Sequence, residues 1–361
     1  MAKRRQRSDD DGQSHRRTEK RRRRLHLLVN DCNRGFSMYK VNVDDFDTDD
    51  SDSDAEDDID SKAQRLRRRR MVVRLAGGGC QSFLAVGTKI FDLYPSSSDH
   101  RANVVFDTTT RLVTTTPPFQ APKKLAEFWA VGRTIYALEC IPAHRHFREG
   151  SEPGCFERLG REPRPGYGTW RWEALPSPPF KLGAVVSLAV HPDCATVFLS
   201  VHKTGTFSFD GERLAWERHG GWLLPFAGEA HYVRELDAWV GLSSRQRGRI
   251  AACQVVDVGR RHGAEPTCKS GKDWLYSKSN RHLDANLTYM GNAEFCLQET
   301  LTREGDDADT TFGLKVLMLL RAVTFRVEYS GDGELCAVNR RARIFKLPRH
   351  SSERRPFAFW I

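Results

Sequence analysis

The sequence has no long hydrophobic run, and this absence argues against a membrane-spanning helix. Its most apolar short segment, residues 316–320, is followed by Arg321, whereas a spanning helix needs about 20 apolar residues. The charged N-terminus lacks the apolar stretch of a secretory signal. The nine cysteines are scattered and never form a Cys-x-x-Cys pair. We therefore expect reduced thiols in an intracellular protein that does not bind membranes.

Motifs of catalysis are also absent. Serine hydrolase chemistry needs a nucleophile on a constrained turn, and the sequence has no Gly-x-Ser-x-Gly. Gly77-Gly78-Gly79 is not followed by Gly-Lys-Ser or Gly-Lys-Thr, and Gly271-Lys272-Asp273 lacks the hydroxyl that would hold magnesium. No cluster of tyrosine, cysteine and histidine for a copper-radical centre can be recognised. We expect no enzyme activity, no catalytic residues and no cofactor.

One group of residues has the composition of a zinc site. Cys140, His144, His146 and Cys155 could supply two thiolates and two imidazoles to a tetrahedral metal. The His-x-His spacing suits a closed site poorly, and the surrounding segment is irregular. Surface histidines and buried thiols are the ordinary explanation, so we expect no metal.

Charge is strongly segregated near the N-terminus. The net charge is +10 and the pI is about 9.2. Residues 1–24 are basic, residues 44–60 acidic and residues 62–70 basic again, while charges beyond residue 71 are interspersed. Segments this polar cannot bury enough apolar surface to offset chain entropy. We therefore predict disorder for the tail at 1–24 and for the insertion at 44–70.

The basic tail resembles a nuclear-import signal. An import receptor binds such side chains in an extended chain, which suits a disordered segment. A solvated charge run and contact with nucleic acid are the alternatives, although no aromatic residue lies among the arginines to stack on bases. We expect a nuclear protein, with the cytoplasm as the alternative location. The signal residues are Lys3, Arg4, Arg5, Arg16, Arg17, Lys20, Arg21, Arg22, Arg23 and Arg24.

The acidic insertion contains two candidate phosphorylation sites. Ser51 and Ser53 each have an acidic residue three positions later, as acidophilic kinases prefer. Phosphates there would deepen the negative field. A solubilising loop, or a loop that folds back on the flanking arginines, is the alternative.

Three stretches of the sequence share parts of one repeated unit. The parts are an alternating strand, an Asp-containing turn, a second strand and a Pro-Phe exit. The turns are Asp107-Thr108-Thr109-Thr110-Arg111 and Asp210-Gly211-Glu212-Arg213, and the exits end at Phe119, Phe180 and Phe226. Spacings of roughly 40 to 60 residues are typical of β-propeller blades.

The remaining pattern also favours a propeller. Between residues 71 and 347 short strands come in close pairs joined by Gly, Asp, Asn or Pro, and helical periodicity is nearly absent. The predicted strands include 82–86, 89–93, 103–107 and 134–139, and a strand at 314–320 that ends before Arg321 and is followed by another at 324–329. A sandwich needs fewer strands, so we predict an all-β propeller of about six blades. Residues 142–168 are predicted to form a long surface insertion.

These patterns predict the domain boundaries and the strands that close the propeller ring. We place the propeller at residues 25–348 and a C-terminal tail at 349–361. Residues 27–29 or 36–43 are predicted to complete the sheet that contains residues 343–347, because closure removes an exposed edge.

One block carries a family resemblance, supported by residues 27–30 and 34–39 as an opening strand pair. It runs Phe207-Ser208-Phe209-Asp210, Trp216, then Gly221-Trp222-Leu223-Leu224-Pro225-Phe226-Ala227-Gly228-Glu229-Ala230-His231-Tyr232-Val233-Arg234-Glu235-Leu236-Asp237-Ala238-Trp239-Val240-Gly241-Leu242. It resembles a grass-expanded plant family, domain of unknown function sixteen-sixty-eight, which looks like a kelch or F-box-associated propeller. The resemblance covers residues 25–348 and implies a propeller and a plant source, but no activity. The chain departs from kelch repeats in lacking their diglycines, and it lacks the helices of an F-box.

These observations favour a monomeric, non-catalytic platform for protein–protein interaction. Candidate contacts in the long insertion are His144, Arg145, His146 and Arg148. Two alternatives stay open: a substrate adaptor for a ubiquitin ligase, recruited without its own F-box, and a sugar oxidase or hydrolase housed in the propeller. A deep pocket with converging Tyr, His and carboxylates would favour the enzyme. Most tryptophans are predicted to fill the core rather than to form interface hot spots: Trp129, Trp170, Trp172, Trp216, Trp222 and Trp239.

Overall fold

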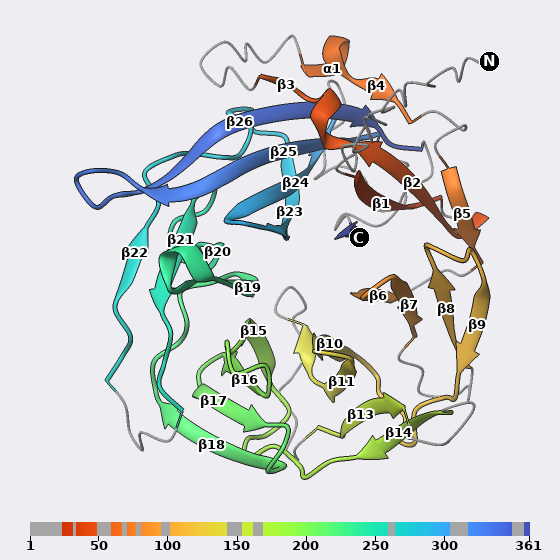
Figure 1. Ribbon diagram of the computed structural model, residues 1–361, viewed down its shortest axis with the longest axis vertical. Helices are drawn as coiled ribbons and strands as arrows, with labels where there is room; N and C mark the ends of the chain where they lie inside the picture. The colour runs from red at the N-terminus through yellow and green to blue at the C-terminus, as the bar shows by residue number, and fades with distance from the viewer. Residues whose placement is uncertain are drawn as a thin grey trace, which may run out of the picture.

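Small antiparallel sheets follow one another around a ring in the computed structural model (Figure 1). The structure describes residues 24–31, 34–48, 59–66, 71–76, 81–94, 102–142, 154–161, 169–258, 264–303, 317–348 and 357–361. Within these residues helix is limited to α1 (Ile59–Lys62) and to short 3-10 turns, which include η2 (Val43–Asp45) and η5 (Arg234–Leu236). None of the described helices has the length and apolar character to cross a membrane.

The strands form four-stranded groups with up-and-down order. Three groups are β27-β1-β2-β5, β6-β7-β8-β9 and β10-β11-β13-β14. Their strands are β1 (Arg24–Asn30), β2 (Phe36–Asn42), β5 (Met71–Leu75), β6 (Ser82–Val86), β7 (Lys89–Leu93), β8 (Asn103–Asp107), β9 (Val113–Thr116), β10 (Ala126–Val131), β11 (Thr134–Glu139), β13 (Phe156–Arg161), β14 (Trp170–Ala174) and β27 (Phe357–Trp360).

The second half of the ring has the same order. A nine-stranded sheet contains β15 to β18 and β19 to β22, which are joined by parallel pairing of β15 with β19; β12 also pairs with β15. The group β23-β24-β25-β26 follows. The strands are β12 (Ile141–Pro142), β15 (Ala184–Val190), β16 (Thr196–Val201), β17 (Gly205–Asp210), β18 (Ala215–Gly220), β19 (Gly228–Val233), β20 (Ala238–Leu242), β21 (Ile250–Gln254), β22 (Cys268–Ser270), β23 (His282–Gly291), β24 (Glu294–Thr302), β25 (Met318–Tyr329) and β26 (Leu335–Lys346).

The apolar core is divided into clusters that lie between neighbouring groups. One cluster joins Trp129 of β10 to Leu188 of β15, and another joins Phe91 of β7 to Trp172 of β14. Further clusters fill the remaining junctions in the same way, including the junction between the last group and the first. In a β-propeller, small sheets pack face to face around a full circle. Within each sheet the strands follow one another from the centre of the ring to its outer edge. The predicted fold class is therefore confirmed.

The repeated turns have one geometry. Asp107 Oδ1 accepts hydrogen bonds from the amides of Thr109 and Thr110 at 2.9 and 3.1 Å. Asp210 Oδ1 accepts from the amides of Glu212 and Arg213, both at 2.9 Å. A short acidic side chain that bonds its own following amides fixes a tight turn between two strands. The sequence repeat is thus a repeat of structure.

The Pro-Phe exits anchor one group to the next. Phe119, Phe180 and Phe226 are all buried. The indole of Trp172 donates to the carbonyl of Pro117 at 3.1 Å, and that of Trp216 to Pro176 at 3.0 Å. The buried indole of Trp172 and the half-buried indole of Trp216 therefore each bond a chain segment that leaves a sheet, which explains why tryptophans and Pro-Phe pairs recur together.

The ring is closed by the C-terminal strand, not by the strand that we predicted. β27 pairs antiparallel with β1, in the register Leu25 with Trp360 and Leu28 with Phe357. The proposed pairing of residues 27–29 or 36–43 with 343–347 is wrong, and residues 357–361 are part of the propeller rather than of a tail. The alternation Phe357-Ala358-Phe359-Trp360 is too short to identify a strand from sequence alone.

Parts of the insertion at 44–70, predicted to be disordered throughout, are placed on the last group. β3 (Asp47–Thr48) and β4 (Gln64–Arg65) extend its sheet by pairing with β26, and Asp60 of α1 bonds Arg281 and Arg303. The prediction of disorder was wrong because it considered only the local composition. Ion pairs between Asp60 and two arginines far away in the sequence stabilise the ordered part of the insertion. Residues 49–58 and 67–70 lie outside the described part of the chain.

Two further corrections concern strands. β13 lies inside the segment 142–168 that we predicted as a surface insertion, and it pairs with both β11 and β14. β25 passes without a break through Arg321, where the sequence suggested an end.

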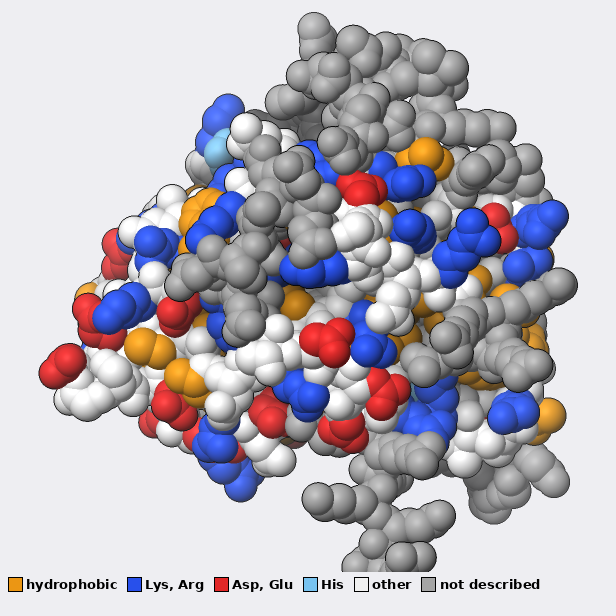
Figure 2. All heavy atoms as spheres, turned by 90° about the horizontal axis from the view of Figure 1, so that it is seen from above, with side chains coloured by type: hydrophobic (Ala, Val, Ile, Leu, Met, Phe, Trp, Pro, Cys, Tyr) orange, Lys and Arg blue, Asp and Glu red, His pale blue; other side chains and the backbone are white. Residues whose placement is uncertain are grey.

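On the side of the ring that carries β26, the coloured basic and acidic side chains are interspersed, as the sequence indicated (Figure 2).

Candidate functional site

A cavity of about 570 Å³ lies beside the inner strands β10, β15, β19 and β23 of the ring. We call it the central pocket. Its apolar lining includes Val185, Leu223, Phe226 and Leu242, and its polar lining is Glu127, His202, Ser243, Ser244, Arg247, Tyr276, His282 and Asp284. These residues come from β10, β15, β20 and β23 and from the segments that follow β16, β18, β20 and β22. A concave, mostly preformed space with a few convergent polar groups is typical of a ligand site.

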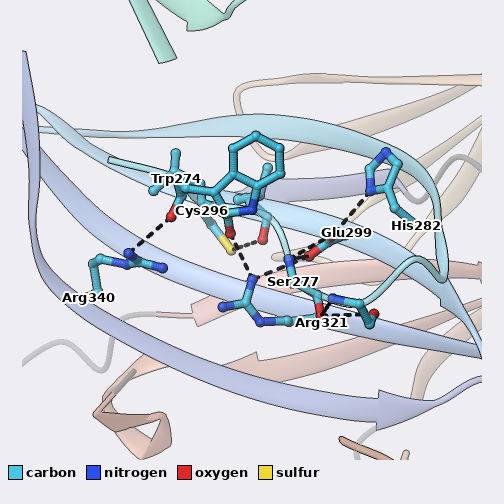
Figure 3. A network of polar contacts seen from close by, with 10 residues as sticks. Trp274, Ser277, His282, Cys296, Glu299, Arg321 and Arg340 are labelled. Carbon is cyan, nitrogen blue, oxygen red and sulfur yellow. Dashed lines mark hydrogen bonds and ion pairs between the residues drawn. The ribbon is translucent and has the colours of Figure 1, made fainter. Parts of the chain in front are cut away.

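His282 is held at the edge of this pocket by a buried carboxylate. Its Nδ1 lies 3.0 Å from Glu299 Oε1, and the Glu299 side chain is fully buried (Figure 3). A carboxylate only accepts hydrogen bonds, so Nδ1 of His282 carries the proton and donates. In the neutral ring Nε2 is then an acceptor.

Glu299 is balanced by an arginine from the neighbouring strand. Glu299 of β24 and Arg321 of β25 are direct partners in the strand register, and Arg321 Nη1 lies 3.3 Å from Glu299 Oε2. The amide of Ser277 donates to both carboxylate oxygens, at 3.1 and 2.9 Å. A buried carboxylate is tolerated only when it is paired and hydrogen-bonded, and both conditions hold here.

Three aromatic rings run from the pocket to the surface. Tyr276 stacks on His282 with ring centroids 4.3 Å apart and planes inclined by 13°. Trp274 meets Tyr276 edge-on at 6.1 Å, and 44% of Trp274 is exposed. Burial, with the Glu299 charge as the next cause, raises the pKa of Tyr276 to about 12. The phenol is therefore protonated and can donate a hydrogen bond near neutral pH.

Gly248 makes room for the exposed tryptophan. Its φ is +78°, a conformation that side chains rarely adopt, and a Cβ there would lie 2.9 Å from the Trp274 ring. The amide of Leu275 donates to the carbonyl of Gly248 at 2.7 Å, which fixes the segment. We call Trp274, Tyr276 and His282 the aromatic strip.

Most of the sequence-predicted site residues lie outside the described part of the chain: the signal residues from Lys3 to Arg23, Ser51 and Ser53, and His144, Arg145, His146 and Arg148. Arg24 is the first residue of β1 and pairs with Asn42, so it belongs to a strand and not to the tail. Of the zinc candidates, Cys140 is buried, which raises the pKa of its thiol well above the usual value, and Cys155 is half-buried. Within the described residues no three His, Cys, Asp or Glu side chains gather as a metal site would need.

The sequence reasoning missed the aromatic strip and Glu299. The prediction about tryptophans holds for Trp129, Trp172 and Trp239, which are buried, but it did not consider Trp274. A signal was available: Trp274 lies in a polar segment next to Gly271-Lys272-Asp273 rather than in an alternating strand. The pairing of Glu299 with Arg321 had no local signal, because it depends on strand register.

The ring of sheets and its central pocket define a β-propeller protein with a concave cavity. The chain belongs to the family described as "Protein of unknown function (DUF1668)", whose profile matches residues 22–345. The family resemblance seen in the sequence is therefore confirmed.

Among the solved structures that this chain resembles are two distant likenesses, both with TM-scores too low to support an argument. A protein of unknown function from Bacteroides thetaiotaomicron is 10% identical with a TM-score of 0.40, and the match covers 76% of this chain and 61% of that one. The β-propeller domain of Cps50 (Swd1) from Myceliophteria thermophila is 9% identical with a TM-score of 0.41, covering 89% and 86%. Comparison with curated proteins finds no match.

Proposed function

We propose that the protein is a non-catalytic platform for protein–protein interaction, and that a partner docks over the central pocket with the aromatic strip as its anchor. The observation that carries the proposal is the exposure of Trp274 beside the pocket: 44% of a tryptophan is accessible while its ring neighbours Tyr276. Exposed aromatic residues next to a concave surface supply most of the binding energy in many interfaces. A rigid ring of sheets holds that surface in one shape, which lowers the entropic cost of binding.

The lining of the pocket fits a partner segment of mixed character. Leu223, Val186 and Ala227 offer accessible apolar surface, while Asp284 and Arg247 offer charges of both signs. A peptide that places an apolar side chain inside the pocket and a polar group at its rim would contact both the apolar and the charged lining. This division, apolar centre and polar rim, is the usual anatomy of a protein interface.

Proximity labelling followed by mass spectrometry tests the proposal. The full chain fused to a labelling enzyme is compared with Trp274→Ala and with Leu112→Ala, since Leu112 is another exposed apolar residue, 62% accessible, in the turn between β8 and β9. We expect a set of labelled proteins that is lost with Trp274→Ala and kept with Leu112→Ala. Identical sets from the wild type and Trp274→Ala would refute the docking site.

The proposal includes a nuclear location and an import receptor as a partner. The support is the sequence alone: two basic clusters in the polar tail that precedes β1, Lys3 to Arg5 and Arg16 to Arg23. A fluorescent fusion of the full chain should accumulate in the nucleus, and replacement of these basic residues by glutamine should leave it distributed through the cytoplasm. Nuclear accumulation of the replaced protein would contradict the import signal.

A hydrolase housed in the pocket is the second candidate, favoured by one observation. His282 is oriented by a buried carboxylate and lines the pocket together with Tyr276 and Asp284. A histidine whose Nδ1–H is bonded to a carboxylate can accept a proton at Nε2. Assays with chromogenic esters and glycosides on the wild type and His282→Gln separate the two candidates, because only a hydrolase would lose turnover in the variant.

A further inference from the structure

Cys253 and Cys268 face each other in neighbouring strands on the outer side of the β19 to β22 group. They are direct register partners in the antiparallel pair of β21 and β22. On either side of them, the amide of Gln254 donates to Thr267 at 2.9 Å and the amide of Gly271 to Ile250 at 2.8 Å. In an antiparallel pair of strands, hydrogen-bonded residue pairs alternate with non-hydrogen-bonded ones. Cys253 and Cys268 therefore form a non-hydrogen-bonded pair.

This kind of pair brings the two cysteine backbones to disulfide distance. In antiparallel sheets its Cα atoms lie about 4.5 Å apart, closer than in a hydrogen-bonded pair. A disulfide accepts Cα separations from about 4.4 to 6.8 Å. Bond formation therefore requires no change of strand register.

The side chains already turn towards each other. The two sulfur atoms are 2.8 Å apart, which is closer than the optimal separation of about 3.5–4.0 Å for unbonded carbon atoms. Cys253 and Cys268 are the described cysteines whose sulfur atoms contact each other, whereas exposed Cys194 has its sulfur near the carbonyl of Pro192.

The two thiols differ in reactivity. The sulfur–sulfur hydrogen bond can run in either direction, but only 1% of Cys253 is exposed and Cys268 is half-buried, so we place the negative charge on Cys268. The hydrogen bond from Cys253 lowers the pKa of Cys268, and the Arg245 guanidinium lowers it further. The same hydrogen bond and burial raise the pKa of Cys253 far above its usual value.

We propose that Cys253 and Cys268 are a modification site that forms a reversible disulfide on reaction with a peroxide. The Cys268 thiolate attacks one peroxide oxygen, the O–O bond breaks, and the leaving hydroxide takes a proton to become water. The sulfur of Cys253 then attacks the resulting sulfenic acid, the S–O bond breaks, and the proton of Cys253 leaves with the hydroxyl as a second water. The two thiols lose two electrons, which the peroxide accepts.

Reduction reverses the reaction through the accessible sulfur. A small thiol such as glutathione attacks Cys268 and Cys253 leaves as a thiol after taking up a proton. A second glutathione then releases Cys268 and forms glutathione disulfide. This inference does not depend on the proposed function.

Differential alkylation of the full chain tests the proposal without any variant. The reduced protein is treated with hydrogen peroxide, free thiols are blocked with N-ethylmaleimide, and peptides are analysed by mass spectrometry before and after reduction. We expect the loss of the two thiols of Cys253 and Cys268, a linked peptide lighter by two hydrogen atoms, and full recovery with glutathione. Two free thiols after treatment, or a bond from Cys253 to another cysteine, would overturn it.

Two matched variants test the assignment of the nucleophile. In Cys253→Ser the sulfenic acid of Cys268 has no partner and should be trapped by dimedone. In Cys268→Ser the buried Cys253 should stay reduced, and Cys194→Ser should form the disulfide as the wild type does. Dimedone labelling at Cys253 instead of Cys268 would contradict the order of the steps.

Discussion

Asp60 and Arg281 form an ion pair at 2.5 Å although 221 positions separate them in the sequence. Arg303 bonds the other oxygen of the same carboxylate at 3.0 Å, and only 16% of the Asp60 side chain is exposed. Arg281 immediately precedes His282 of the aromatic strip. The acidic insertion is therefore tied to the group that carries the candidate site.

Replacement of this carboxylate should loosen α1. Asp60→Asn removes the charge from two half-buried arginine contacts, so we expect a loss of about 1–2 kcal/mol in stability and faster amide exchange in Ile59–Lys62. Hydrogen exchange with mass spectrometry measures the second effect. Asp47→Asn is the control, because Asp47 is 79% exposed at its contact with Arg343 and should change little. Equal exchange in both variants would contradict the role of Asp60.

The pair of Glu299 and Arg321 should be strongly interdependent. Glu299→Gln removes the carboxylate charge that faces the buried Arg321, and breaking a buried pair costs about 3–5 kcal/mol. Urea denaturation measures the loss. Glu299→Gln together with Arg321→Met should recover most of it, since no charge is then buried alone. A single variant within about 0.5 kcal/mol of the wild type, the usual range for surface changes, would refute this interpretation.

Closure of the ring should depend on β27. Phe359 is 8% exposed and belongs to the apolar cluster that contains Phe83 and Ile90 of the next group. Phe359→Ala should lower the free energy of unfolding by about 3–5 kcal/mol, as for other buried phenylalanines, while Phe359→Leu should cost less. Thermal denaturation followed by circular dichroism gives the comparison. If both variants unfold at the wild-type temperature, β27 does not close the propeller.

Acid should destabilise the protein through His26. Burial, followed by the charges of Lys40 and Arg24, lowers the pKa of His26 from 6.5 to about 4, and its Nδ1 is buried without a hydrogen-bond partner. The unfolded chain therefore binds a proton between pH 6.5 and 4 that the folded chain does not, so stability falls as the pH falls through this window.

A variant isolates this contribution. His26→Leu removes the titrating group and should flatten the decline in unfolding free energy by up to about 3 kcal/mol. Burial also lowers the pKa of His219, so part of the acid sensitivity should persist in the variant. Unfolding free energies measured by urea at several pH values test this. An unchanged slope in His26→Leu would show that His26 is not responsible.

The sequence correctly predicted the strands whose alternation and turn residues lie close together along the chain. The ranges 82–86, 89–93, 103–107 and 134–139 were predicted as they occur, because period-two alternation and a turn residue lie within a few positions of each other. The sequence failed at Arg321, where a charge suggested a strand end. The charge is accommodated inside β25 by Glu299 of the neighbouring strand.

The candidate site could not be predicted in the same way. His282, Glu299 and Arg321 are unremarkable in the sequence, and they meet because three strands align in one register. By itself the sequence determined the all-β character, the repeated turns and the family, since these rest on neighbouring residues. Only the tertiary structure decided which strand closes the ring, how the buried charges pair and where the pocket lies, because contacts between distant residues set all three.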